Sequence, residues 1–266
     1  MKLLMYIILG LIQGFTEPIP VSSSGHLVIF NSLLNVEEFK DLNFEIIVNF
    51  GSLLAILYFY RKELISIIKD FFMYIKTKDN KYKENYKYAW MIVIATIPAG
   101  LAGLLLKDKI EAITSPKVVG ISLLITALML FLVKDIKGTK TKKDIGIKEA
   151  ITVGLFQVIA LFPGISRSGS TLVGGMSSKL NRETSFKFSF MLYIPISFAT
   201  MILGVKDVAT SGNLSNLWLP YTLGMLVSMV VTYYSIKWFK KLLEEGKLIY
   251  FVYYCLVVGI LTILFL

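Results

Sequence analysis

The chain has 266 residues, of which 55% are hydrophobic and only 17% are charged, whereas soluble domains average about 25% charged residues. This composition excludes an ordinary soluble domain and predicts an integral membrane protein. The formal net charge is +10. Because the sequence offers no soluble basic face, we do not expect nucleic acid as a partner.

Six hydrophobic runs, each largely uncharged, follow residues 1–43. They occupy residues 44–59, 89–106, 118–133, 188–205, 217–236 and 248–266. Each is about long enough to cross a ~30 Å hydrocarbon core as a tilted helix. The runs are too long and too uniformly apolar for barrel strands, so we predict an all-α polytopic membrane protein. We expect residues 1–266 to form a single integral membrane domain.

The first apolar segment contains the polar stretch "QGFTEPIPVSSSGHL", residues 13–27. It holds a carboxylate, three consecutive serines and the only histidine of the chain. Pro18 and Pro20 stand two residues apart, a spacing that breaks a helix. We therefore predict a re-entrant helix-loop-helix over residues 3–34, since irregular backbone at membrane depth is tolerated where protein covers it.

The polar stretch occurs twice. Residues 9–28 align without a gap on residues 153–172, at a constant offset of 144 that places Gln13 on Gln157 and Ser22 on Ser166. Three hydrophobic runs follow each copy, which predicts internal repeats at residues 1–144 and 145–266. The odd number of crossings between the copies predicts two inverted-topology repeats, each a re-entrant helix-loop-helix plus three transmembrane helices. In such a fold the two polar tips meet near the midplane.

Positive charge predicts the orientation. Residues 61–87 carry eight basic side chains and residues 134–148 carry six, and the segments 179–187 and 237–247 are also basic. Such segments are typical of cytoplasmic loops. The connections 35–43 and 206–216 contain one lysine each, so we expect them outside. Both termini are then outside, and the first tip, with the active site, opens to the extracytoplasmic side.

The second tip, "PGISRSGST" (residues 163–171), contains Arg167, the only Arg or Lys within a hydrophobic segment. A buried cation needs an anionic partner, which could be Glu17 or a phosphate. A guanidinium matches phosphate with a planar fork of donors. A structural clamp between helices is the alternative for Arg167. The candidate contacts for a bound phosphate are Gln13, Ser22, Ser24, Ser166, Ser168, Gly169 and Thr171.

The first tip brings three candidate catalytic groups, Glu17, Ser23 and His26. An imidazole at membrane depth is functional by default, and His26 could activate Ser23 or attack phosphorus itself. We expect at least one of the three serines to cap a helix. Glu45 could join Glu17 in a site for Mg²⁺ or Ca²⁺, or could be a solvated carboxylate at a helix start.

With both motifs in view, the chain resembles the bacterial undecaprenyl-diphosphatase family, whose members confer bacitracin resistance. The resemblance covers the whole chain, with one long motif in each half. It implies a multi-pass enzyme of the bacterial inner membrane that hydrolyses undecaprenyl diphosphate to undecaprenyl phosphate and inorganic phosphate. This reaction recycles the lipid carrier for peptidoglycan synthesis.

The resemblance also assigns roles. It implies that Ser23 and His26 match the serine and histidine of the first motif, and that Arg167 matches the arginine that binds the diphosphate. Gln13 matches a position of the first motif that takes an acid or glutamine, Glu17 matches the glutamate four residues on, and Glu45 matches the acid of the third helix. Gln13 is the amide version of its position, so it cannot accept a proton.

One rival function stays open, a transporter or flippase of a polyprenyl phosphate lipid, because inverted repeats with broken helices are also a transporter architecture. The expected partners are a polyprenyl diphosphate lipid and the membrane. The sequence leaves open whether Ser23 or His26 is the nucleophile, and whether the chain forms a homodimer.

Overall fold

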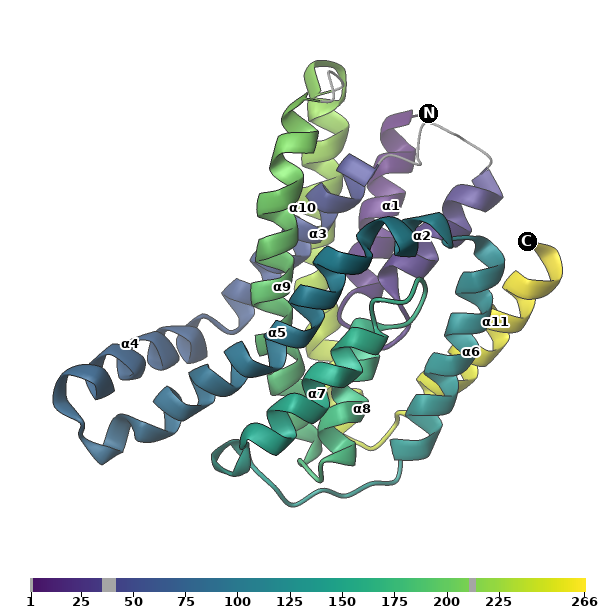
Figure 1. The fold of residues 1–266 in the computed structure, drawn as a ribbon. Helices are drawn as coiled ribbons and strands as arrows, with labels where there is room; N and C mark the ends of the chain where they lie inside the picture. The colour runs from purple at the N-terminus through teal and green to yellow at the C-terminus, as the bar shows by residue number, and fades with distance from the viewer. Residues whose placement is uncertain (1, 35–41, 211–213) are drawn as a thin grey trace.

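The computed structural model describes residues 2–34, 42–210 and 214–266 of the chain (Figure 1). Over these ranges the secondary structure is helical, apart from one isolated bridge between Lys140 and Leu180. The all-α class is therefore confirmed. The elements are α1 (Lys2–Thr16), α2 (Ser23–Leu34), α3 (Leu42–Phe59), α4 (Arg61–Thr77), η2 (Asn80–Tyr82), α5 (Lys83–Ala112), α6 (Pro116–Val133), η3 (Lys142–Asp144), α7 (Ile147–Ile159), α8 (Arg167–Ser177), α9 (Arg182–Thr210), α10 (Leu214–Glu244) and α11 (Ile249–Phe265).

Several helices are suited to a membrane. Four stretches within the described residues are long and apolar enough to cross one, namely Asn80–Leu106, Pro116–Val133, Arg182–Gly204 and Leu217–Glu244. A fifth candidate is the pair α3 and α4, which is bent by 72° where the two helices join. The last hydrophobic run forms α11, an apolar helix of 17 residues. The protein is thus a multi-pass membrane protein, as predicted.

The basic segment 61–87, which we expected to be a loop, is mostly helical. It contains α4, η2 and the first turn of α5, and α4 and α5 form a hairpin that projects from the bundle (Figure 1). The reason lies in its apolar residues, which recur at helical spacing and pack α4 against α5. The connections expected outside, 35–43 and 206–216, include residues 35–41 and 211–213, which lie outside the described residues.

Two helix–break–helix units stand at the predicted places. The chain breaks between α1 and α2 and again between α7 and α8, and both second helices are capped in the same way. The Ser22 hydroxyl accepts a hydrogen bond from the Gly25 N–H at 3.2 Å, and the Ser166 hydroxyl accepts one from the Gly169 N–H at 3.1 Å. Ser22 and Ser166 are matched by the 144-residue offset, so the expectation that a serine caps a helix is confirmed in both halves.

The halves interleave. Helix α1 packs on α10 and α7 packs on α5, while α3 lies on α9 and α6 on α11. Two matched glycines allow the closest approaches: a Cβ atom on Gly10 would lie 2.4 Å from the Gly224 carbonyl oxygen, and one on Gly154 would lie 2.6 Å from that of Ala95. The inverted relation of the two halves stays a prediction.

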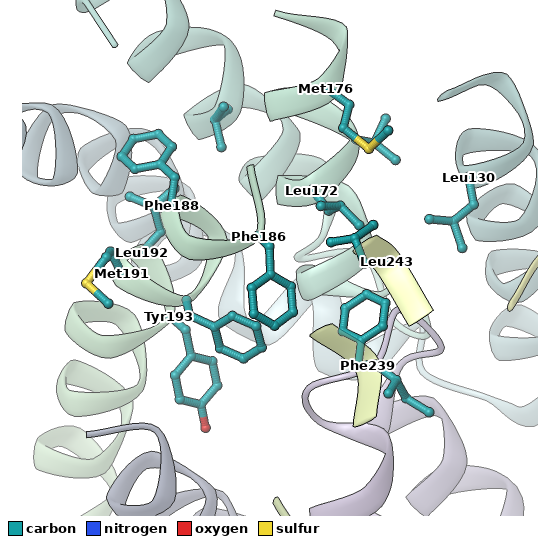
Figure 2. Packing of buried hydrophobic residues seen from close by; sticks show 14 of the residues in the cluster. Leu130, Leu172, Met176, Phe186, Phe188, Met191, Leu192, Tyr193, Phe239 and Leu243 are labelled. Carbon is teal, nitrogen blue, oxygen red and sulfur yellow. The ribbon is translucent and has the colours of Figure 1, made fainter. Parts of the chain in front are cut away.

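A buried apolar cluster fixes the position of α8 in the second helix–break–helix unit. Leu172 and Met176 of α8 pack among aromatic side chains of α9 and α10, including Phe186 and Phe239 (Figure 2). Burial of such side chains is the main stabilising contribution to the positions of these helices. Because Arg167 is the first residue of α8, this core also determines where the guanidinium lies.

Candidate active site

The two breaks touch each other. The Ser168 hydroxyl, in the first turn of α8 directly after the second break, donates a hydrogen bond to the Ile19 carbonyl of the first break at 3.0 Å. A Cβ atom on Gly169 would lie 3.2 Å from Pro20 Cβ. The expectation that the two polar tips meet is therefore confirmed.

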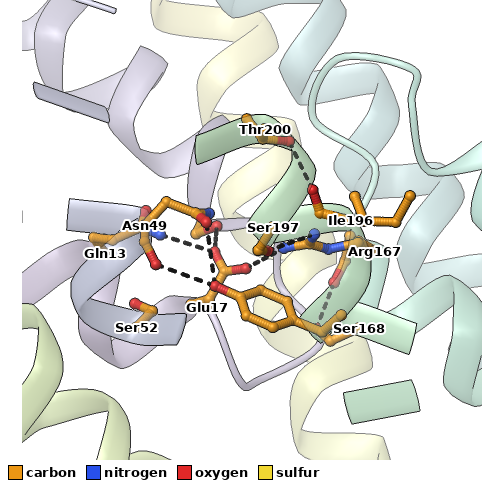
Figure 3. Close-up of polar contacts among 12 residues, drawn as sticks. Gln13, Glu17, Asn49, Ser52, Arg167, Ser168, Ile196, Ser197 and Thr200 are labelled. Atoms are coloured by element: carbon orange, nitrogen blue, oxygen red, sulfur yellow. Dashed lines mark hydrogen bonds and ion pairs between the residues drawn. The ribbon is translucent and has the colours of Figure 1, made fainter. Parts of the chain in front are cut away.

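An ion pair crosses this contact. Arg167 Nη2 lies 2.5 Å from Glu17 Oε1, and only 5% of the Glu17 side chain is exposed (Figure 3). Arg167 Nη1 donates to the Ser197 hydroxyl at 3.2 Å, and the guanidinium lies 4.2 Å above the ring of Tyr193. Arg167 thus has the anionic partner that the sequence required, on a stacked aromatic surface that suits arginine better than lysine.

The other oxygen of Glu17 faces its own tip. Glu17 Oε2 accepts a short hydrogen bond from the Ser23 hydroxyl and one of 2.9 Å from the Gln13 amide. The carboxylate is therefore held between the two halves, with Ser23 on one oxygen and Arg167 on the other. We call Gln13, Glu17, Ser23, Arg167 and Ser197 the Glu17 cluster. It points the Ser23 hydroxyl at a group able to accept its proton.

Both ring nitrogens of His26 contact groups other than the Ser23 hydroxyl, which His26 was expected to activate. His26 lies one helical turn beyond Ser23, and its Nδ1 and Nε2 atoms are each 2.7 Å from an oxygen, the Ser22 carbonyl and the Tyr254 hydroxyl respectively. A carbonyl only accepts, so Nδ1 carries the proton, and in the neutral imidazole Nε2 accepts a hydrogen bond from the Tyr254 hydroxyl. The structure brings Glu17, Ser23 and Arg167 together and holds His26 against α11.

The other candidate residues for phosphate contact are mostly engaged in holding the tips. Ser22 and Ser166 cap helices, and Ser168 joins the two breaks. The buried Thr171 hydroxyl donates to the Arg167 carbonyl at 2.9 Å and contacts the Ser189 hydroxyl at 2.5 Å. Ser24 is exposed. A contact between any of these residues and a substrate stays a prediction.

A cation site could use an all-oxygen set at this junction. Glu45 of α3, which the sequence predicts to share a cation site with Glu17, is half-buried. The Gln13 Oε1 atom is buried and has no hydrogen-bond partner among the residues that the structure describes. Carboxylate and amide oxygens fit a hard cation such as Mg²⁺ or Ca²⁺. No group of three or more His, Cys, Asp and Glu side chains gathers at such a site within the described residues, so amide, water or substrate oxygens would complete the shell.

Four residues that the sequence did not single out support this geometry: Asn49, Tyr193, Ser197 and Tyr254. Aromatic and small polar side chains inside apolar runs give no distinct signal, since most of them pack in cores or anchor at interfaces. One signal was available. Asn49 and Tyr193 are 144 residues apart, the offset of the repeat, and the Tyr193 hydroxyl lies 3.2 Å from Asn49 Oδ1.

Comparison with known proteins gives full-length matches. The sequence model of the family described as "Bacitracin resistance protein BacA" matches residues 6–261. "Undecaprenyl-diphosphatase 1" of Bacillus cereus is 46% identical over 264 residues, covering 99% of this chain and 97% of that protein. "Undecaprenyl-diphosphatase" of Oceanobacillus iheyensis is 41% identical, covering 98% and 96% of the two chains.

Proposed function

The chain belongs to the bacitracin resistance protein BacA family, and on that premise we propose that it hydrolyses undecaprenyl diphosphate to undecaprenyl phosphate and inorganic phosphate. The observation that carries the proposal is the buried Glu17 carboxylate, which Arg167 and Ser23 hold from opposite halves of the chain. This arrangement joins an anion-binding cation, a nucleophilic hydroxyl and a base. A lipid diphosphate needs all three at membrane depth, where its tail can stay in the bilayer.

The first step follows from competition for Arg167. The terminal phosphate of the substrate binds the guanidinium through its fork of donors and displaces Glu17. The freed carboxylate takes the proton of Ser23, and Ser23 Oγ forms a bond to the terminal phosphorus. The bond from that phosphorus to the bridging oxygen breaks, and undecaprenyl phosphate leaves. Water then hydrolyses the phosphoserine and releases inorganic phosphate.

Glu17 and Glu45, with Gln13 Oε1, would hold a divalent cation, which when bound offsets phosphate charge. His26 is the alternative nucleophile. In the described structure its Nε2 lone pair is occupied by the Tyr254 hydroxyl, whereas the Ser23 hydroxyl already contacts a base. We therefore favour Ser23.

We further propose that the site opens to the extracytoplasmic side and that both termini lie there. The support is the basic segments 61–87 and 134–148, which favour the cytoplasm. The only native cysteine, Cys255, is buried, so a cysteine introduced at Lys143 in η3 would report its side. An impermeant maleimide should label it in inverted vesicles and not in intact cells.

The proposal is tested with purified protein, undecaprenyl diphosphate and a phosphate assay. Phosphate release that depends on Ser23 and Arg167 supports it. Tight binding of the lipid without phosphate release would instead favour the transporter. The acid stability of a trapped phosphoenzyme distinguishes Ser23 from His26 as the nucleophile, because phosphoserine survives acid and phosphohistidine does not.

A further inference from the structure

The α4–α5 hairpin carries an exposed apolar surface away from the Glu17 cluster. Four large side chains of α4, each about half or more exposed, recur at intervals of three, four and three residues: Ile65, Ile68, Phe72 and Ile75. This spacing places them in one stripe along the helix. Beside the stripe lies a groove of about 230 Å³ between α4 and α5, lined only by apolar residues that include Phe71 and Trp90.

A row of lysines borders this stripe. Lys62, Lys69 and Lys76 are seven residues apart, lie on one side of α4 and are exposed. None of the three forms an ion pair within the part of the chain that the structure describes. The carboxylates of α4 are engaged elsewhere: Glu63 binds Lys142 at 2.9 Å, and Asp70 accepts from Asn85 at 2.5 Å. The exposed side of α4 therefore combines unpaired positive charge with apolar surface.

The direction of α4 suits a membrane surface. The 72° bend after α3 sends α4 across the direction of α3, which is part of the membrane bundle. In this arrangement α3 is the crossing part of the bent pair and α4 runs along the bilayer surface, where its apolar side chains enter the acyl region and its lysines reach the headgroups. Trp90, 44% exposed beside the groove, is of the residue type that gathers at this level.

We propose that α4 and the start of α5 form a binding surface for anionic phospholipids. An acyl chain occupies the groove beside Trp90, and Lys62, Lys69 and Lys76 bind the phosphate headgroups. The opposite charge of the headgroups and the continuity of the stripe with the exposed apolar side of α5 identify lipid as the occupant. This surface is separate from the reaction, so it does not depend on the proposed function.

Tryptophan quenching tests the proposal in the full chain. A variant with Trp218→Phe and Trp238→Phe keeps Trp90 as the only tryptophan, and vesicles mix phosphatidylglycerol and phosphatidylcholine, with one or the other brominated. We expect brominated phosphatidylglycerol to quench Trp90 more strongly than brominated phosphatidylcholine does. The difference should correspond to a roughly fivefold local enrichment of the anionic lipid, which is the contribution of about one lysine near an anionic surface. High salt should remove the preference.

The variant Lys62→Gln/Lys69→Gln/Lys76→Gln should lose the preference while total quenching persists. The control Lys137→Gln/Lys143→Gln/Lys148→Gln removes the same charge from the exposed α6–α7 connection and the start of α7, and should keep it. Equal quenching by both lipids in the parent protein would overturn the proposal. An unchanged preference in the Lys62→Gln/Lys69→Gln/Lys76→Gln variant would also overturn it. Protection of Trp90 from quenching by both lipids would overturn it too, because protein would then cover the groove. Circular dichroism confirms that each variant is folded.

Discussion

Arg167 and Ser23 occupy matched positions of the two tips, 144 residues apart, and bind the two oxygens of the same carboxylate, Glu17. The repeat thus supplies a cation at one site and a hydroxyl at its counterpart. This difference between the halves places a guanidinium on one oxygen of Glu17 and a hydroxyl on the other.

The fork of Arg167 is the first feature to test. Arg167→Lys keeps the charge but loses either the Glu17 or the Ser197 contact and the flat stacking on Tyr193. We expect kcat/KM to fall about 10²-fold, the usual loss when one donor to a developing oxyanion is removed. Arg61→Lys is the matched control, because the Arg61 guanidinium also lies 4.2 Å above a tyrosine ring but is exposed. Equal losses in both variants would argue against a phosphate contact at Arg167.

The hydroxyl of Ser23 should be essential. Ser23→Ala removes the proposed nucleophile, and we expect phosphate release to fall by at least about 10³-fold while lipid binding persists. Ser32→Ala, an exposed serine later in α2, should remain near the parent rate. Near-normal turnover of Ser23→Ala would exclude the serine mechanism and return attention to His26.

Tyr254 should be the hydrogen-bond partner of His26 Nε2. Because His26 is the only histidine, ¹⁵N-labelled histidine gives the signal of a single imidazole. We expect the parent protein to show the Nδ1–H form and Tyr254→Phe to show a changed Nε2 signal, since Nε2 loses its donor at 2.7 Å. The exposed Tyr253 offers the control Tyr253→Phe. Identical spectra in all three proteins would contradict the hydrogen bond.

Removal of divalent cations should stop the reaction if Glu17 and Glu45 hold a metal. Chelation should abolish phosphate release and Mg²⁺ should restore it. Glu45→Gln removes one charged ligand, so the Mg²⁺ concentration for half-maximal activity should rise by about tenfold or more. Glu84→Gln, an exposed carboxylate of α5, should leave this concentration unchanged. A Mg²⁺ requirement that is the same in all three proteins would remove Glu45 from the metal site.

The matched glycines should matter for stability. Gly10→Ala and Gly154→Ala place a methyl group against a carbonyl oxygen of α10 or α5, at the 2.4 Å and 2.6 Å given above. We expect each to destabilise the fold by about 1–3 kcal/mol, as overpacking does, seen as a lower Tm in detergent. Gly100→Ala adds a methyl group that no described residue approaches within 4 Å, so its Tm should hold or rise because alanine favours helix. A fall in Tm for all three would indicate a general effect of the substitution.

The sequence by itself determined the class of the protein, the positions of the six apolar runs and the two broken segments. It could do so because these features are local: apolar length, paired prolines and a polar stretch repeated at one offset are visible without a partner. Burial of charge also determined that Arg167 needs an anion, which proved to be Glu17.

Only the tertiary structure decided which groups face one another. The proton acceptor nearest Ser23 is Glu17 and not His26, because the ring of His26 is held by Ser22 and by Tyr254, 228 residues away. The same holds for the Tyr193 ring beneath the Arg167 guanidinium. Such contacts depend on how distant helices pack, and a residue pattern along one segment contains no record of the side chains brought to it from another.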